Sequence, residues 1–508
     1  MTLPTRPTEP PSSVSATIVF SSLALLAFVV LAGGSVRLAG GLVVVATIAA
    51  LVRPVLIGWP RLVAALILII MFIPIRRYTL PASLPFQLEP YRVFVVLLVL
   101  GWLASLLVDS RITFRRTGFE GPLLMIVGAA FASIVANPGR VAHVSTFVNK
   151  SLMFFLSFVL VLFLVASVIR RLEDVDYLAK TLVICGTVVA ISAVVEARTG
   201  FNVFNHLSRV FPFLHGGAIS GPEFIRMGTG RLRVFGSAEH PIALSAALVV
   251  IVPLAIYLAR CHAQRRWIAC ALALSIGAVS TVSRTGIVMF AVIGVVFLWL
   301  RPRETRRLWP ALVPALIVIH FAVPGTLGSI KNSFMPPGGL VAEQESQAGK
   351  SGSGRLADLG PGIREWKRQP LVGQGFGTRV VESSATTSSN NILDDQWLGT
   401  LLETGILGFF GWLWFFARAV RRFGAEAKRD AGARGWLLVS ITASVAAYGV
   451  GMLTYDAFSF IQVTFLLFIL VGLGSALVAE RSAPVTLLAR ARRRREPGAL
   501  PAGNAPGA

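Results

Sequence analysis

About fourteen apolar stretches, each long enough to cross a lipid bilayer, run through the 508 residues of this chain. A helix needs roughly 20 apolar residues to span a hydrocarbon core about 30 Å thick. A mean hydropathy of +0.73 excludes a soluble globular domain. The sequence therefore predicts an all-α, polytopic membrane protein with 12–14 spans, the first three being interrupted by Pro54, Pro60 and Arg61. The predicted spans are residues 15–33, 35–52, 58–75, 91–108, 119–136, 149–169, 176–195, 240–259, 267–282, 285–300, 307–324, 396–417, 435–454 and 458–479.

Two connections between spans are long, residues 197–239 and 325–395, and the second separates the spans near 307–324 and 396–417. Lys and Arg near span ends favour the cytoplasm and set the orientation of the chain. Basic residues recur at every second connection, which places both long loops outside the cytoplasmic membrane and the C-terminus inside. The residues that set this orientation are Arg170, Arg171, Arg260, Arg265, Arg266, Arg301, Arg303, Arg306, Arg307, Arg418, Arg421, Arg422, Lys428, Arg429 and Arg434. Arg76 and Arg77 fall on the wrong side of this scheme.

The two ends of the chain differ in composition from the spans. Residues 1–14 are rich in Pro, Ser and Thr, and residues 481–508 are basic and then rich in Pro, Gly and Ala. Both are predicted to be disordered and cytoplasmic. The remaining transmembrane helices fall into an N-terminal group, 15–196, and a C-terminal group, 421–480. The net charge of +23 follows mostly from the basic connections and predicts attraction to anionic membrane lipids.

Several classes of function find no support in the sequence. A nucleic-acid partner is not expected, because no folded basic surface with interleaved aromatic residues is present. The three cysteines fall in spans and an inner connection, which excludes a disulfide framework. No CxxC, HExxH or His/Cys cluster indicates a metal, and no GxxxxGK[ST] motif indicates ATP-driven transport by this chain alone. We therefore expect no metal and no cofactor.

Arginines are concentrated on the predicted outer side, where cations are normally depleted. The first outer loop carries more arginines than acidic residues, namely Arg198, Arg209, Arg226, Arg231 and Arg233 against Glu223 and Glu239. Arg284 lies at the outer turn between two spans. Arginine beside a bilayer is costly and predicts a functional site, the alternative being a side chain that snorkels to the interface. Because guanidinium grips phosphate oxygens bidentately, a lipid-linked diphosphate is the kind of ligand that these arginines predict.

The second outer loop, about 70 residues long, changes character along its length. Residues 337–354 are flexible by composition, and residues 355–366 predict a short amphipathic helix. A Gly-rich turn, Pro370–Thr378, follows. Asp394 and Asp395 precede the next span and suit N-capping of its helix, which is compatible with catalysis. Glu403 lies roughly two turns inside that span, where a carboxylate usually faces a bundle interior and pairs with a cation.

Four motifs occur in order, with consistent sidedness, over residues 225–420. They are Arg231–Gly236 followed by His240-Pro241, then Ser283-Arg284, then Arg355 with Trp366 and Pro370–Gly377, and finally Asp394–Leu398 with Glu403–Gly408. Together they resemble the shared domain of the O-antigen ligase and O-antigen polymerase superfamily, including its Arg-x-x-Gly opening and its large-loop signature.

The resemblance implies a transferase that acts on polyprenyl-diphosphate-linked glycans outside the cytoplasmic membrane, with a glycan or lipid as acceptor. In such enzymes arginines hold the diphosphate, a role that carries over to Arg233, Arg284 and Arg355. Ligases of this group place a His in the large loop where this chain has Asp394. That departure leaves a polymerase-like or other glycan-transfer role open. His240 stands at a position that the family treats as structural.

Glycan transfer from a diphosphate requires two kinds of chemistry. Fixed guanidinium groups stabilise the charge that builds on the leaving diphosphate. A carboxylate within hydrogen-bond reach can deprotonate the acceptor hydroxyl, and Asp394 is the favoured base, with Asp395 and Glu403 as the other candidates. The competing interpretation is a transporter or flippase of lipid-linked sugars. Such proteins tend to show internal repeats, and no clear repeat relates the two halves of this sequence.

Overall fold

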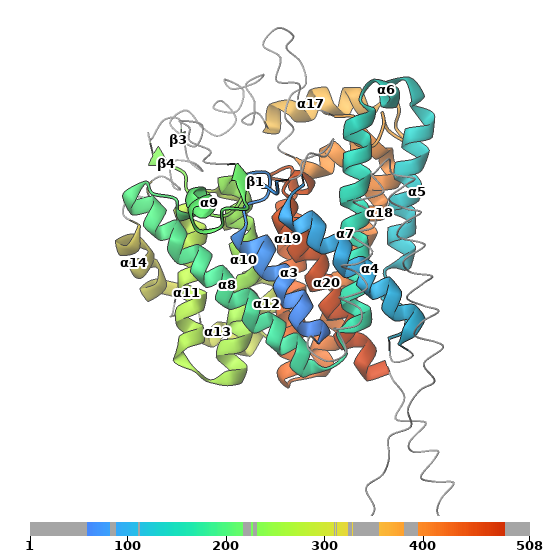
Figure 1. The fold of residues 1–508 in the computed structure, drawn as a ribbon. Coiled ribbons are helices and arrows are strands. Elements are labelled where there is room, and N and C mark those ends of the chain that lie inside the picture. The colour runs from blue at the N-terminus through green and yellow to red at the C-terminus, as the bar shows by residue number, and fades with distance from the viewer. Residues whose placement is uncertain are drawn as a thin grey trace, which may run out of the picture.

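The computed structural model describes residues 58–81, 88–109, 112–216, 225–226, 231–308, 310, 312–323, 328, 355–379 and 395–482. The predicted spans 15–33 and 35–52 lie outside the described residues, as do Asp394 and both chain ends. Figure 1 shows a bundle of long helices that run between two ends, one of which carries the short strands and α17.

Every span predicted from residue 58 onward has a matching helix. These helices are α3 (Trp59–Phe72), α4 (Pro90–Val108), α5 (Glu120–Ala136), α7 (Ser145–Val168), α8 (Leu172–Thr199), α10 (Pro241–His262), α11 (Arg265–Ser280), α12 (Arg284–Leu300), α14 (Leu312–Ala322), α18 (Gln396–Arg429), α19 (Ala433–Gly451) and α20 (Ile461–Ser482). Seven helices in the described part of the chain, α4, α7, α8, α10, α18, α19 and α20, are long and apolar enough to cross a membrane. The predicted all-α, polytopic fold class is confirmed.

Short elements connect these helices. They are β1 (Tyr78–Thr79), α6 (Pro138–His143), η1 (Val203–His206), α9 (Leu207–Val210), β2 (His215–Gly216), β3 (Ile225–Arg226), β4 (Arg231–Leu232), α13 (Pro302–Leu308), α17 (Arg355–Trp366) and η4 (Ala457–Ser459). The strand pairs β1–β2 and β3–β4 are antiparallel, with Tyr78 opposite Gly216 and Ile225 opposite Leu232. The short helix predicted at residues 355–366 is confirmed as α17.

Two helix boundaries differ from the predicted spans. The stretch 307–324 begins within the basic helix α13, and α14 covers only Leu312–Ala322. Helix α18 continues to Arg429, well past the predicted end at residue 417. The residues beyond 417 are mostly Arg, Ala, Glu and Lys, which favour helix even though they are not apolar. The span predicted from hydropathy is therefore shorter than the helix that the structure shows.

The core of the bundle is formed by α10, α19 and α20. The apolar window of α20 is 100% buried and that of α10 is 89% buried, whereas only 33% of the α4 window is buried. Helices that are apolar on all sides belong in the interior. Glycines allow the close approach, since a Cβ on Gly472 would lie 2.9 Å from Val165 and one on Gly277 would lie 2.6 Å from Ala190.

The basic connections gather at one end of the bundle, and the two long loops start and finish at the other (Figure 1). Hydrogen bonds connect segments at the basic end. Arg422 donates to the carbonyl oxygen of Thr117, and Arg434 donates to that of Leu477 at 2.9 Å. Which of the two ends faces the cytoplasm stays a prediction.

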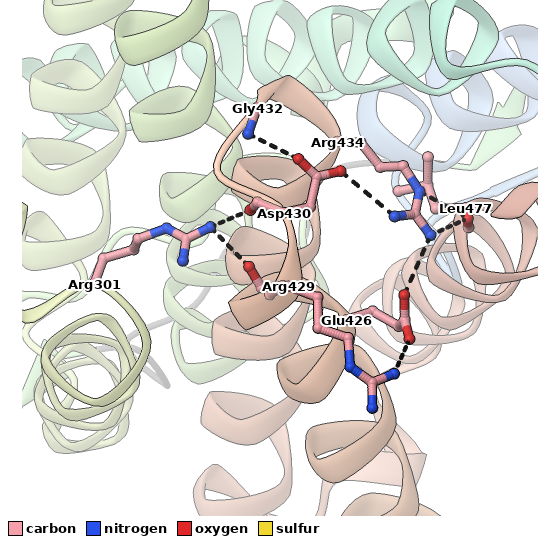
Figure 2. Close-up of polar contacts among 8 residues, drawn as sticks. Arg301, Glu426, Arg429, Asp430, Gly432, Arg434 and Leu477 are labelled. Carbon is pink, nitrogen blue, oxygen red and sulfur yellow. Dashed lines mark hydrogen bonds and ion pairs between the residues drawn. The ribbon is translucent and has the colours of Figure 1, made fainter.

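Arg301 ties α12 to the end of α18 within this basic end (Figure 2). Its guanidinium donates to the carbonyl oxygen of Ala427 at 2.7 Å and also to that of Asp430. The Asp430 carboxylate accepts from the Gly432 N–H at 2.8 Å and lies 3.5 Å from Arg434. The last carbonyls of a helix have no partner within it, so the buried guanidinium of Arg301 completes the hydrogen bonding of α18.

Replacing Arg301 by leucine is expected to lower the free energy of unfolding by about 1.5–3 kcal/mol, because buried carbonyls lose a charged donor. The midpoint of thermal unfolding of the detergent-solubilised protein measures this change. Arg429→Leu is the matched control, since Arg429 is 66% exposed and bonds only to Glu426 in the described structure. An exposed pair contributes less than about 1 kcal/mol. Equal losses in the two variants would contradict the role assigned to Arg301.

Candidate active site at the loop-bearing end

The Gly-rich turn of the second long loop docks into a break in α18. Gly405, near the start of α18, has non-helical angles of φ 65° and ψ −163°. The break frees backbone groups on both of its sides, and residues 370–375 satisfy them. The hydrogen bonds run from Gln374 N to Leu402 O at 2.9 Å, Gly375 N to Glu403 O at 3.2 Å, Ile406 N to Pro370 O at 2.9 Å and Leu407 N to Leu371 O at 3.4 Å.

Glycine is required on both sides of this contact. Gly373 has a φ of 69° and Gly405 a φ of 65°, in the left-handed region that disfavours other residues. A Cβ on Gly405 would lie 2.2 Å from the Leu371 oxygen, and one on Gly373 would lie 2.5 Å from the Glu403 carbonyl carbon. Two of the motifs quoted from the sequence, Pro370–Gly377 and Glu403–Gly408, are therefore the two halves of one structural unit.

Helix α5 and the start of α6 support the docked turn from behind. The Gly375 N–H donates to Ser133 Oγ at 3.0 Å, and that hydroxyl donates to the Glu403 carbonyl oxygen. Asn137 donates to the Gly373 carbonyl oxygen at 3.0 Å. Sequence reasoning missed both side chains. The signal available was a polar residue, Asn137, at the end of an apolar span and directly before a proline.

The side chain of Glu403 lies under the same turn. The backbone N–H groups of Gly377 and Arg379 face its carboxylate, and Asp456 lies within electrostatic reach. Arg379 in turn pairs with Glu365 of α17 at 3.1 Å. The sequence predicted a catalytic carboxylate or one paired with a cation. The positive charge of Arg379 acts on the Glu403 carboxylate, and the catalytic role of Glu403 stays a prediction.

The connection between α19 and α20, residues 452–460, gathers the N-terminal ends of three other helices. At the start of α18, the Gln396 N–H donates to the Met452 carbonyl at 2.9 Å. At the start of α12, Thr454 Oγ1 donates to Thr285 Oγ1 at 2.9 Å. At the start of α10, the His240 ring stacks on Phe460 with centroids 5.6 Å apart. Sequence reasoning did not single out this connection, whose short length gave no pattern.

The structure places several of the predicted site residues at or near these helix ends. Arg284 is the first residue of α12 and Arg233 precedes the cap of α10. Asp395 caps α18, accepting from the N–H groups of Trp397 at 2.9 Å and Leu398 at 3.1 Å. Arg355 begins α17, and its side chain is outside the described part. Asp394 is outside the described residues altogether.

His240 is held as an uncharged cap of α10. Its Nδ1 accepts a hydrogen bond from the Ile242 N–H at 3.1 Å. Burial, assisted by the nearby positive charge of Arg233, lowers the pKa of His240 to about 4. The ring is therefore neutral at physiological pH, which agrees with the structural role that the family resemblance implies for this position.

Buried charges hold the segment 233–240 in place. Arg77 donates to Asn205 Oδ1 and to the Gly236 carbonyl, both at 3.1 Å. Burial lowers the pKa of Arg77 to about 10, so that it stays cationic at neutral pH. The Glu196 carboxylate accepts from the Gly236 N–H at 2.9 Å. Arg76 and Arg77, the exceptions to the predicted orientation, thus both contact this segment, since Arg76 pairs with Glu239.

The burial of Glu239, which pairs with Arg76 at 2.8 Å, makes the stability of the protein depend on pH. Burial raises the pKa of Glu239 to about 7 despite the attraction of Arg76. Between about pH 4.5 and pH 7 the folded protein therefore keeps a proton that the unfolded chain has lost. Stability is expected to fall by up to about 3 kcal/mol as the pH rises through this window.

Thermal unfolding midpoints of the wild type and of Glu239→Gln across pH 4–8 check this expectation. The variant should show a flatter profile than the wild type over pH 4.5–7. An unchanged slope in Glu239→Gln would assign the pH dependence to another group.

Comparison with known families identifies part of the chain. The family model of the O-antigen ligase matches residues 268–413, and no curated protein matches the chain. The matched residues run from α11 to the middle of α18 and include Arg284, Arg355, the docked turn and Glu403, whereas Arg233 lies outside them. With its membrane-spanning helices, this chain is a multi-pass membrane protein that carries the O-antigen ligase domain of the O-antigen ligase and polymerase superfamily.

Proposed function

We propose that this protein transfers a glycan from a polyprenyl diphosphate carrier to an acceptor hydroxyl on the extracytoplasmic face of the cytoplasmic membrane. The observation that carries the proposal is the docking of the Gly-rich turn into the break of α18, because it joins two motifs of the ligase family into one unit. That unit is linked through residues 452–460 to the helix ends that bear Arg284 and His240.

In this proposal Arg233, Arg284 and Arg355 bind the donor diphosphate and stabilise the charge on it as it leaves. Arg284 stands at the start of α12, so the partial positive charge of the helix N-terminus adds to that of its guanidinium. Asp394 accepts the proton of the acceptor hydroxyl. Glu403 positions the docked turn and does not touch the reacting atoms. The donor glycan leaves its phosphate oxygen and forms a bond to the acceptor oxygen.

The sidedness of the site rests on the segregation of charge. The basic connections lie at the end opposite to the docked turn, and connections rich in Arg favour the cytoplasm (Figure 1). The site then faces outward. Reporter fusions after Gly352 and Gly432 that gave the same sidedness would contradict this assignment.

The lipid-linked intermediates of a deletion strain test the function itself. A strain without this protein should accumulate polyprenyl-diphosphate glycan on the outer face of the membrane. Single repeat units indicate a polymerase, and full-length lipid-linked polymer indicates a ligase. Unchanged levels of lipid-linked glycan would contradict both roles.

Asp394→Asn is expected to lower transfer by about 10²–10⁴-fold while leaving donor binding unchanged, because an amide cannot accept the proton. Asp395→Asn is the matched control, since Asp395 caps α18 and asparagine caps nearly as well as aspartate. Its transfer rate should stay close to that of the wild type. Full activity of purified Asp394→Asn would refute the base assignment and leave the arginines as the main catalytic groups.

A transporter of lipid-linked sugars is the competing function, and broken helices often form the binding sites of transporters. In α18, however, the N–H and C=O groups beside the break bond to residues 370–375 of the same chain. They are therefore not left to bind a substrate or an ion. This occupancy favours the transferase.

A further inference from the structure

The segment that follows α8 presents apolar side chains outward at the loop-bearing end. Residues 201–213 lead from the end of α8 through η1 and α9 towards β2, and we call them the apolar loop (Figure 1). Several large apolar side chains exposed in one segment mark an interaction surface. The exposed apolar residues of the loop are Phe201 at 50%, Val203 at 46%, Val210 at 69%, Phe211 at 42% and Phe213 at 51%.

The inner side of the apolar loop is fastened to the bundle. Phe204 is 4% exposed, and its carbonyl oxygen accepts from the hydroxyl of the buried Tyr78 at 2.8 Å. The same hydroxyl accepts from the Leu207 N–H at 3.2 Å. Asn202 is also buried, and its Oδ1 accepts from the Phe204 N–H at 2.9 Å. The exposed side chains are therefore carried on a backbone that these contacts hold in place.

Helix α8 shows at which level the apolar loop begins. Lys180 pairs with Asp176 at 2.6 Å, and residues 181–195 carry no charge. The rise from Lys180 to Arg198 is about 27 Å, close to the thickness of the hydrocarbon core of a bilayer. Arg198 therefore stands at the boundary of this core, and the apolar loop begins three residues later. The exposed apolar residues between these two charges follow one face of α8, at Ile184, Val188, Ile191 and Val195.

Helix α14 ends at the same level as α8. The Arg198 guanidinium donates to the carbonyl oxygens of Phe321 and Ala322 at 2.6 and 2.7 Å, in the last turn of α14. Phe321 is 71% exposed, and Leu316 of the same helix is 50% exposed. Two helices with exposed apolar faces thus end beside the apolar loop, which starts at the edge of a surface that lipid covers in a membrane protein.

We propose that the apolar loop binds the lipid bilayer and inserts its exposed apolar side chains into the leaflet at the loop-bearing end. A segment with one apolar and one polar side lies in the membrane interface, with its apolar side chains at the boundary between headgroups and acyl chains. The occupant of this surface is lipid because the surface adjoins the exposed apolar faces of α8 and α14. Arg209 of the loop is exposed and would extend towards the headgroups.

Insertion of the apolar loop would also fix the depth of the segment that carries Arg233. The Asn202 side-chain amide donates to the Gly236 carbonyl oxygen at 3.1 Å, and the Gly236 N–H donates to Glu196 of α8 at 2.9 Å. The segment from Arg233 to Gly236 is thus bonded to the apolar loop and to α8. Under the proposed function, Arg233 then lies near the headgroups, at the level of the diphosphate of a lipid-linked donor.

Photocrosslinking tests the contact with lipid in the otherwise native chain. p-Benzoylphenylalanine replaces Phe211 or Phe213, the full chain is placed in phosphatidylcholine nanodiscs, and mass spectrometry identifies the adducts after irradiation. Both positions should give phosphatidylcholine adducts in the same yield as Val188, the control on the exposed face of α8. The adduct should be lost when the label replaces Arg429, which is 66% exposed at the opposite end.

Two results would overturn the inference. The first is the absence of a lipid adduct at both Phe211 and Phe213 while Val188 gives one, which would place the apolar loop in water. The second is crosslinking of both positions to protein in place of lipid, which would show that another segment or a second copy of the chain covers the loop. Neither result bears on the transferase function, which the lipid-linked intermediates of the deletion strain test separately.

Discussion

Lysine in place of Arg284, or of Arg233, is expected to lower the rate of glycan transfer about a hundredfold or more. A lysine ammonium is a point charge and cannot reproduce the planar fork that holds two phosphate oxygens at once. Loss of one preorganised donor to a developing charge typically costs between 10²- and 10³-fold in rate. The measurement is transfer by purified protein with a lipid-linked donor, together with the amount of protein inserted in the membrane.

Arg198→Lys is the matched control for these variants. Arg198 also belongs to the loop-bearing end, but its guanidinium bonds to the carbonyl oxygens of Phe321 and Ala322 at 2.6 and 2.7 Å. Its activity should stay within a few-fold of the wild type. Full activity of both Arg233→Lys and Arg284→Lys would contradict the proposal that these two residues bind the donor diphosphate.

Gly405→Ala is expected to release the docked turn and to lower transfer by a hundredfold or more while the bundle stays folded. The backbone angles of Gly405, φ 65° and ψ −163°, are essentially limited to glycine and cost another residue about 1–3 kcal/mol, and the added methyl group would lie 2.2 Å from the Leu371 oxygen. Hydrogen exchange reports the release directly, because the amides of Gln374 and Gly375 lose their acceptors in α18. Both amides should exchange faster in the variant.

Gly399→Ala is the control on the same helix. Gly399 lies in the helical first turn of α18, and a Cβ there would be 3.7 Å from the Gln396 side chain, an ordinary contact. Alanine favours helix over glycine, so this variant should be neutral or slightly stabilised. If Gly405→Ala kept wild-type activity although both amides exchanged faster, the docked turn would not be part of the active site. Unchanged amide protection would contradict the requirement for glycine at this position.

The helices could be predicted from the sequence because one physical quantity, the length of an apolar stretch, decides them. The same quantity failed at α18, where twelve residues beyond the predicted end at residue 417 continue the helix to Arg429. Half of those residues are charged, which lowers the hydropathy of the segment, but most of them favour helix. The short helix α17 was predictable from its amphipathic pattern alone.

Residues of the candidate site could be predicted from the sequence only where placing them near a membrane costs free energy. Arg284 and Glu403 stood out because charges near a membrane are rare. Ser133 and Asn137 did not, since an ordinary polar residue at a span end carries no such signal. Arg76 stood out as an exception to the orientation rule, but its pairing with Glu239 joins positions far apart in the chain. No local pattern contains that information.

The way in which the Gly-rich turn is fastened has a consequence for specificity. Four main-chain hydrogen bonds attach residues 370–375 to α18, and none of them uses a side chain of the turn. The glycines are fixed by their backbone angles, and the Gln374 side chain is held by hydrogen bonds with Arg140 and with the Glu365 carbonyl oxygen. Leu371 is 65% exposed and free of this constraint, so side chains at such positions can be exchanged without moving the backbone. Under the proposed function, the exposed side chains of this turn are positions at which recognition of the glycan can be altered, by evolution or by design, while the backbone of the turn stays bound to α18.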